Sequence, residues 1–87
     1  MMKQALIQYL ENWVKNGRGD QFGLVGVLQQ QYGFSVILEN KTTKNRFVPN
    51  ILPLTLVQKA LIQNNPQARA ALDRELETSL VKELISG

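Results

Sequence analysis

The sequence predicts a small α+β domain spanning residues 1–87, with N-terminal helices, a central antiparallel β-hairpin and two C-terminal helices. Three observations predict this class. Apolar residues recur at helical spacing in residues 3–16, a β-rich stretch with a polar centre occupies residues 34–48, and leucines recur every four residues within residues 66–86. Hydrophobic residues make up 44% of the chain and charged residues 20%, which is typical of a folded domain.

The first helix is predicted over residues 3–16. Its apolar stripe consists of Leu6, Ile7, Leu10, Trp13 and Val14. Gly17 follows at the position of a C-terminal cap, where glycine adopts the left-handed conformation without steric cost. The single tryptophan is expected in the core because its neighbours in the stripe are apolar, and the alternative is a partly exposed anchor for a partner.

Residues 20–33 fit two interpretations. As a helix, the segment has Asp20 as its N-cap, Gly33 as its end, and a buried stripe of Phe22, Val25, Leu28 and Tyr32. As a strand, residues 22–28 form an extended run in which two glycines mark bends. Each glycine costs a helix about 1 kcal/mol relative to alanine. The three consecutive glutamines that follow favour a helix, so the helix is the prediction and the strand is the alternative.

A β-hairpin is predicted over residues 34–48. Residues 34–38 are rich in β-formers, residues 46–48 form the return strand, and residues 40–45 are the polar tip. Pro49 has no backbone N–H to donate, so strand pairing is expected to end there.

Two helices are predicted at the C-terminal end, over residues 54–63 and 66–86. The break between them contains two asparagines followed by Pro66, a combination that caps a helix and starts a new one. Within the second helix, Arg69 and Asp73 stand four residues apart and are expected to form a supporting ion pair. Its apolar stripe includes Leu72, Leu76, Leu80 and Leu84.

Two residue types are missing from the chain, which contains no histidine and no cysteine. These residues carry much of the nucleophilic, proton-transfer and metal chemistry near pH 7. We therefore expect no enzyme, no catalytic residues, no metal site and no cofactor. We also expect a cytoplasmic protein without a membrane segment, because polar residues interrupt the first apolar positions and no apolar run approaches the length of a membrane span.

The polar tip of the hairpin is the first candidate functional site. Lys41, Thr42, Lys44 and Arg46 lie within six residues, in a chain of net charge +3. A protruding turn of this kind can place cationic groups against phosphates, while hydroxyls add hydrogen bonds. These four residues therefore predict a nucleic-acid contact, and the competing interpretation is a solvated turn that happens to be basic.

The C-terminal leucine stripe is the second candidate. Leucines at four-residue spacing suit a helix packed on its own domain, and they also suit a helix shared across a subunit interface. We expect a non-catalytic binding module that contacts nucleic acid through the hairpin tip. The alternative is a protein–protein adaptor or homo-oligomer that uses Leu72, Leu76, Leu80 and Leu84 as its interface.

Overall fold

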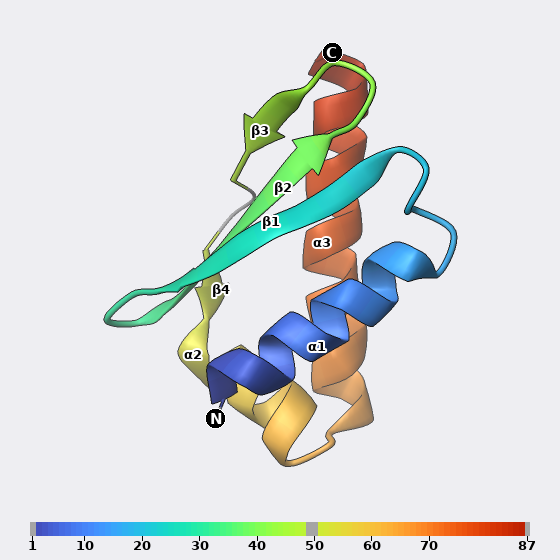
Figure 1. The fold of residues 1–87 in the computed structure, drawn as a ribbon. Coiled ribbons are helices and arrows are strands. Elements are labelled where there is room, and N and C mark those ends of the chain that lie inside the picture. The colour runs from blue at the N-terminus through green and yellow to red at the C-terminus, as the bar shows by residue number, and fades with distance from the viewer. Residues whose placement is uncertain (1, 49–50, 87) are drawn as a thin grey trace.

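The structure, a computed structural model, describes residues 2–48 and 51–86. The elements in chain order are α1 (Met2–Lys15), β1 (Phe22–Gln29), β2 (Gly33–Asn40), β3 (Asn45–Phe47), β4 (Leu52–Pro53), α2 (Leu54–Val57), η1 (Gln58–Ile62, a π-helical stretch) and α3 (Pro66–Ser86). Figure 1 shows the long helix α3 behind the sheet and α1 beside β1. This arrangement is the α+β class that the sequence predicts.

The sheet is antiparallel and is built around β2. Strand β1 pairs with β2 from Phe22 opposite Asn40 to Gln29 opposite Phe34. Strands β3 and β4 pair with opposite ends of the other edge of β2. The register between β1 and β2 shifts between Leu24 and Gly26, so the intervening residue is a β-bulge.

The predicted helix over residues 20–33 is wrong, and the strand interpretation holds. Residues 22–29 form β1, and the chain then turns into β2. Phe22, Leu24 and Val27 share one face of the sheet because each stands opposite an even-numbered residue of β2. The bulge sets Leu24 and Val27 three positions apart instead of two. It therefore hides the period of two that identifies a strand and leaves a spacing that resembles a helix.

The remaining predicted elements are confirmed. Gly17 has φ of 93° and ends α1. The side chain of Asn65 caps α3, because its Oδ1 accepts hydrogen bonds from the backbone N–H groups of Gln67 (2.9 Å) and Ala68 (3.2 Å). Strand β3 ends at Phe47, and Pro49, where pairing was expected to stop, lies outside the described residues.

One hydrophobic core joins the helices to the inner face of the sheet. Its fully buried members include Leu6, Leu10, Phe34, Val36, Leu38, Leu52, Val57, Ala60, Leu72 and Leu76. Trp13 is also in this core, with 6% of its surface exposed, as its position in the α1 stripe predicts. No helix of the described residues lies on the outer face of the sheet (Figure 1).

Candidate functional site

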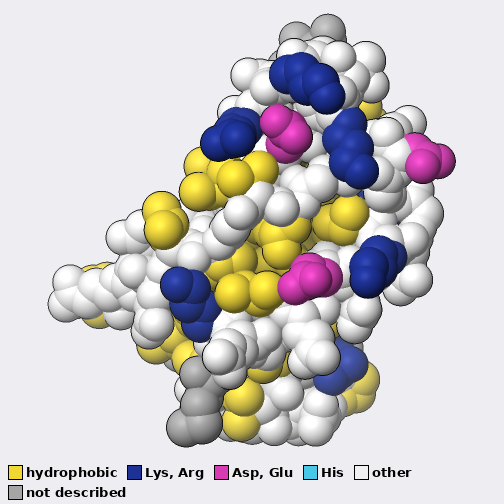
Figure 2. Space-filling view, in the orientation of Figure 1, with side chains coloured by type: hydrophobic (Ala, Val, Ile, Leu, Met, Phe, Trp, Pro, Cys, Tyr) yellow, Lys and Arg dark blue, Asp and Glu magenta, His cyan; other side chains and the backbone are white. Residues whose placement is uncertain are grey.

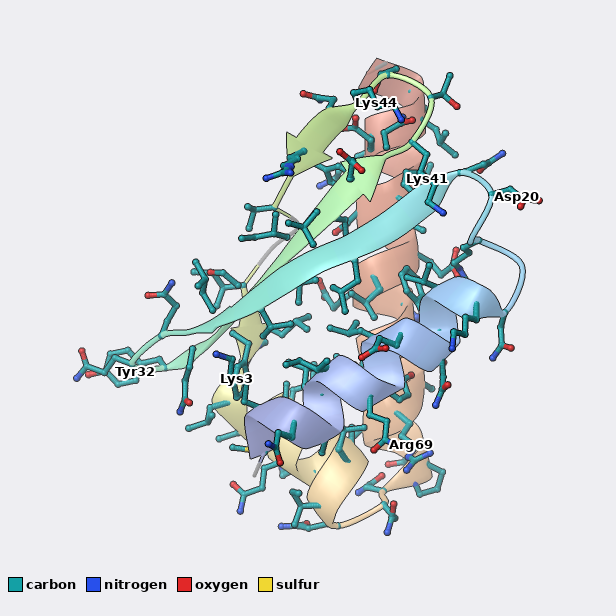
Figure 3. The ribbon with its side chains drawn as sticks, in the orientation of Figure 1. Lys3, Asp20, Tyr32, Lys41, Lys44 and Arg69 are labelled. Atoms are coloured by element: carbon teal, nitrogen blue, oxygen red, sulfur yellow. The ribbon has the colours of Figure 1, made fainter. Side chains whose placement is uncertain are left out.

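The predicted nucleic-acid residues gather at one end of the β2–β3 hairpin. Lys41, Thr42 and Lys44 lie in the connecting turn, Arg46 lies in β3, and all four are exposed. The turn is held by Asn40, whose Oδ1 accepts a hydrogen bond from the backbone N–H of Thr42 at 3.0 Å. Figure 3 shows the two lysines at this end of the hairpin, with Lys41 on the side facing the loop before β1.

One backbone carbonyl and two carboxylates lie at this end of the hairpin. The Lys41 Nζ donates a hydrogen bond to the carbonyl oxygen of Gly19 at 2.6 Å. The Arg46 Nε lies 3.9 Å from a carboxylate oxygen of Glu39. On the side facing α3, Glu83 accepts a hydrogen bond from the side chain of Asn45 at 3.3 Å. The positive potential at the hairpin tip is therefore weaker than the sequence alone suggests.

The leucine stripe of α3 belongs mostly to the core of the single chain. Leu72 and Leu76 are fully buried and Leu80 is 4% exposed, so a second subunit cannot contact these three side chains in this conformation. Leu84 is 53% exposed and lies near two other exposed apolar residues of the last turns, Val81 and Ile85. Of the four predicted interface residues, only Leu84 is accessible to a partner.

The described residues form a groove with a mainly apolar lining between α1 and β1. It has a volume of about 420 Å³ and is lined by Ile7, Glu11, Val14 and Lys15 from α1 and by Leu24, Val25 and Gly26 from β1. We call it the α1–β1 groove. Figure 2 shows apolar side chains exposed between the hairpin and α1, with acidic and basic side chains beside them.

The backbone of β1 has an unpaired edge next to this groove. Hydrogen bonds from Lys41 N to Gln21 O (2.8 Å) and from Gln30 N to Gly33 O (2.7 Å) show that the backbone groups of Gln21 and Gln30 point toward β2. Since the direction alternates along an antiparallel strand and the bulge adds one residue, Leu24 and Val27 direct their N–H and C=O groups away from β2. No hydrogen bond to these outward groups occurs within residues 2–48 and 51–86.

The two outer edges of the sheet differ in length and charge. Strand β3 has three residues and carries Arg46, features that discourage pairing with another strand. Strand β1 has eight residues and no charged side chain. Two of its side chains, Val25 and Leu28, are 42% and 52% exposed. A long, uncharged and partly apolar edge of this kind is a template for strand addition.

Polar contacts with α3 hold α1 in position as one wall of the groove. Tyr9 donates a hydrogen bond to the carboxylate of Asp73, and Arg18 forms an ion pair with Glu77. Arg18 also donates to the carbonyl oxygen of Trp13 at 2.8 Å, and its guanidinium lies 4.3 Å from the Trp13 ring centroid. The Tyr9 contact fixes the middle of α1, and the Arg18 contacts fix its end, which is nearest the start of β1.

The predicted ion pair between Arg69 and Asp73 is wrong. The Arg69 side chain instead donates to the carbonyl oxygen of Ala60 at 2.9 Å and to the side chain of Asn64 at 2.8 Å. These hydrogen bonds of Arg69 stabilise the turn between η1 and α3. The Asp73 carboxylate instead accepts a hydrogen bond from Tyr9. Burial raises the pKa of the Tyr9 hydroxyl well above its usual value, and the neighbouring Asp73 carboxylate adds to the increase.

The described part of the chain offers no cluster of three metal-ligating side chains. Its helices are each too short or too polar to cross a lipid bilayer, as judged over residues 2–48 and 51–86. No known protein family matches the sequence, and the searches of curated proteins and of solved structures likewise found no match.

Proposed function

We propose that the chain is a non-catalytic binding module that takes up an extended segment of a partner protein in the α1–β1 groove. One observation carries the proposal. The outer edge of β1 presents unpaired N–H and C=O groups at Leu24 and Val27, directly beside an apolar groove. An added strand would pair with this backbone, and its side chains would enter the groove, which is how strand addition provides affinity and specificity.

A polypeptide is the ligand whose chemistry fits this edge. Successive outward-facing residues of a strand present donors and acceptors at a repeat that another extended backbone reproduces. The lining of the groove is mainly apolar, with Ile7, Val14 and Leu24 at its floor and Val25 at its rim. Alternate side chains of an added strand would bury apolar surface there.

Substitutions on β1 test the proposal. Val25→Lys places a charge at the open edge, where it blocks strand addition. The fold should tolerate this substitution because Val25 is 42% exposed. The matched control is Leu28→Lys on the same strand, at a residue that is 52% exposed and does not line the groove. The ligand is an uncharged fluorescent peptide, acetyl-Gly-Ser-Thr-Val-Thr-Gln-Thr-Gln-Thr-Ser-amide, followed by fluorescence anisotropy.

The proposal expects binding to the unmodified protein and to Leu28→Lys, and at least a tenfold loss with Val25→Lys, which corresponds to about 1.4 kcal/mol. Replacing the first glutamine of the peptide by proline should also weaken binding, because proline removes a backbone donor. Equal binding by both lysine variants, or no binding up to about 1 mM peptide, would contradict the proposal.

A second copy of this chain is an alternative occupant of the β1 edge. In that case, light scattering on the purified protein would report a mass of two chains that reverts to one in Val25→Lys. That result would replace the peptide ligand by self-association through the same edge. A mass of one chain at high concentration supports the peptide.

A second candidate function is nucleic-acid binding at the hairpin tip. The observation that favours it is the joint exposure of Lys41, Lys44 and Arg46 at one end of the hairpin. If each cation neutralises one phosphate, the affinity for duplex DNA should fall with a log–log salt slope of roughly −2.7. Changing all three to alanine should abolish binding. An affinity that is independent of salt, or that survives the triple substitution, would rule this candidate out.

A further inference from the structure

We infer that the segment taken up in the α1–β1 groove carries an apolar residue, a basic residue and an acidic residue at alternate positions, in that order from its N-terminus. This inference rests on the proposed function and adds the sequence chemistry and the chain direction of the partner. It follows from the charges on the rim of the groove and from the direction of α1 relative to β1.

The rim of the groove carries one charge of each sign. Glu11 and Lys15 both line the groove, both are exposed, and they stand one helical turn apart on α1. Their separation along the helix axis is about 6 Å, because each residue of an α-helix rises about 1.5 Å. Two residues of an extended strand span about 6.6 Å. Side chains at alternate positions of an added strand therefore match the spacing of these two charges.

The backbone of β1 sets the same spacing independently. Leu24 and Val27 are the outward-facing residues on either side of the bulge, and their partners on β2, Leu38 and Val36, are two residues apart. An added antiparallel strand without its own bulge would likewise place two residues, at alternate positions, opposite Leu24 and Val27. Residues directly opposite one another share a face of the sheet, so both side chains would point to the side on which Leu24 lines the groove.

The chain directions decide which charge comes first. Figure 1 shows α1 and β1 running in opposite directions, because the chain reverses between them. A strand added antiparallel to β1 therefore runs in the same direction as α1. Its residue opposite Val27 comes first and faces Glu11, and its residue opposite Leu24 comes two positions later and faces Lys15. A basic residue at the first of these positions and an acidic residue at the second complete two opposite-charge pairs.

Ile7 completes the pattern. It lies one helical turn before Glu11 and lines the same groove, where it is partly buried. The residue of the added strand two positions before the basic one faces Ile7 and is therefore apolar. The intervening residues point to the outer face of the sheet, and their identity is left unconstrained.

Three peptides test this inference separately from the proposed function. They differ only at the two positions that face Glu11 and Lys15. The matched peptide is acetyl-Gly-Ser-Thr-Val-Thr-Lys-Thr-Glu-Thr-Ser-amide, the reversed peptide exchanges its lysine and glutamate, and the uncharged peptide is the one described above. We expect the matched peptide to bind roughly tenfold more tightly than the reversed one at low salt, and this difference should shrink in roughly 0.5 M salt.

The decisive protein variant exchanges the two rim charges, Glu11→Lys with Lys15→Glu. It keeps the net charge, and the inference expects it to prefer the reversed peptide. The matched control exchanges charges away from the groove, Lys82→Glu with Glu75→Lys, and should leave the preference unchanged. Circular dichroism and Trp13 emission establish that each variant is folded.

The outcomes separate the two claims. If all three peptides bind equally to every variant, the charge pattern is wrong while strand addition stands. If the uncharged peptide also fails to bind, both the inference and the proposed function are overturned. If the reversed peptide is preferred by the unmodified protein, the added strand runs parallel to β1 or the rim charges are not its partners, and the inference is overturned.

Discussion

Tyr9 on α1 donates a hydrogen bond to Asp73 on α3, a residue 64 positions later in the chain. This contact joins the helix that forms one wall of the α1–β1 groove to the helix that forms the back of the core. Both residues lie on partly buried surfaces, so the contact is shielded from water. The position of α1, and with it the width of the groove, depends on this polar contact as well as on apolar packing.

The Tyr9 contact predicts a specific dependence of stability on alkaline pH. The pKa of Tyr9 is raised in the folded chain, so above about pH 10 the folded state retains a proton that the unfolded state has lost. The free energy of unfolding should therefore fall as the pH rises beyond about 10. Tyr9→Phe should lower stability by about 1 kcal/mol at neutral pH and remove this part of the alkaline decline. Urea titrations at pH 8 and pH 11 on both proteins would test it, and parallel pH dependences would contradict the assignment.

Arg18 is expected to stabilise the chain through its geometry as well as its charge. Its guanidinium donates to the carbonyl oxygens of Trp13 (2.8 Å) and Asn16 (3.1 Å), pairs with Glu77 and lies over the indole ring. Lysine retains the charge but cannot reproduce this fork of donors. Arg18→Lys should therefore cost roughly 1–2 kcal/mol and shift Trp13 emission. The matched control, Arg74→Lys at an exposed position of α3, should change stability by less than about 0.5 kcal/mol.

Gly33 is expected to tolerate no side chain. A Cβ at this position would collide with the carbonyl oxygen of Leu52 and lie 2.7 Å from Cγ2 of Ile51, because β4 pairs with β2 directly at this residue. Gly33→Ala should destabilise the chain by roughly 1–3 kcal/mol in urea denaturation. Gly26→Ala provides the contrast, since a Cβ there meets nothing within 4 Å. Its effect should be neutral or stabilising by up to about 1 kcal/mol. Equal losses in both variants would contradict the close approach of Leu52 and Ile51 to Gly33.

The leucines of α3 should separate into core and surface by their stability effects. Leu76 is fully buried, and Leu76→Ala should cost roughly 2–5 kcal/mol because it leaves a cavity in the core. Leu84 is 53% exposed, and Leu84→Ala should cost less than about 0.5 kcal/mol. The check is urea denaturation together with light scattering. A stable protein that only dissociates into smaller assemblies on Leu76→Ala would contradict the intramolecular packing.

The helices and their ends could be predicted because their signals are local. The stripe of α1, the glycine at its end and the asparagine cap of α3 each depend on residues within one or two turns, and the structure bears them out. The hairpin from β2 to β3 was also predictable, since β-formers flank a polar tip. The strand β1 was missed because its bulge at Val25 disrupts the alternation that identifies strands.

The groove could not be predicted because it depends on two elements that meet only in the folded chain. Glu11 and Lys15 look like ordinary solvent-facing residues of a helix until β1 is placed beside them. The open strand edge was hidden for the same reason, because it exists only when residues 22–29 form a strand. The basic tip was visible in the sequence, and so was Glu39, which stands two residues before Lys41. Glu83 follows Asn45 by 38 residues and approaches the tip only in the folded chain.

Amide hydrogen exchange at Leu24 and Val27 tests strand addition most directly. In the unliganded protein these two amides point away from β2 and should exchange quickly, whereas those of Gly26 and Leu28 point toward β2 and should exchange slowly. Adding the matched peptide should slow exchange at Leu24 and Val27 by at least tenfold. The exchange rates of the Gly26 and Leu28 amides should stay slow. Saturating peptide that leaves Leu24 and Val27 exchanging at their original rates would contradict the account.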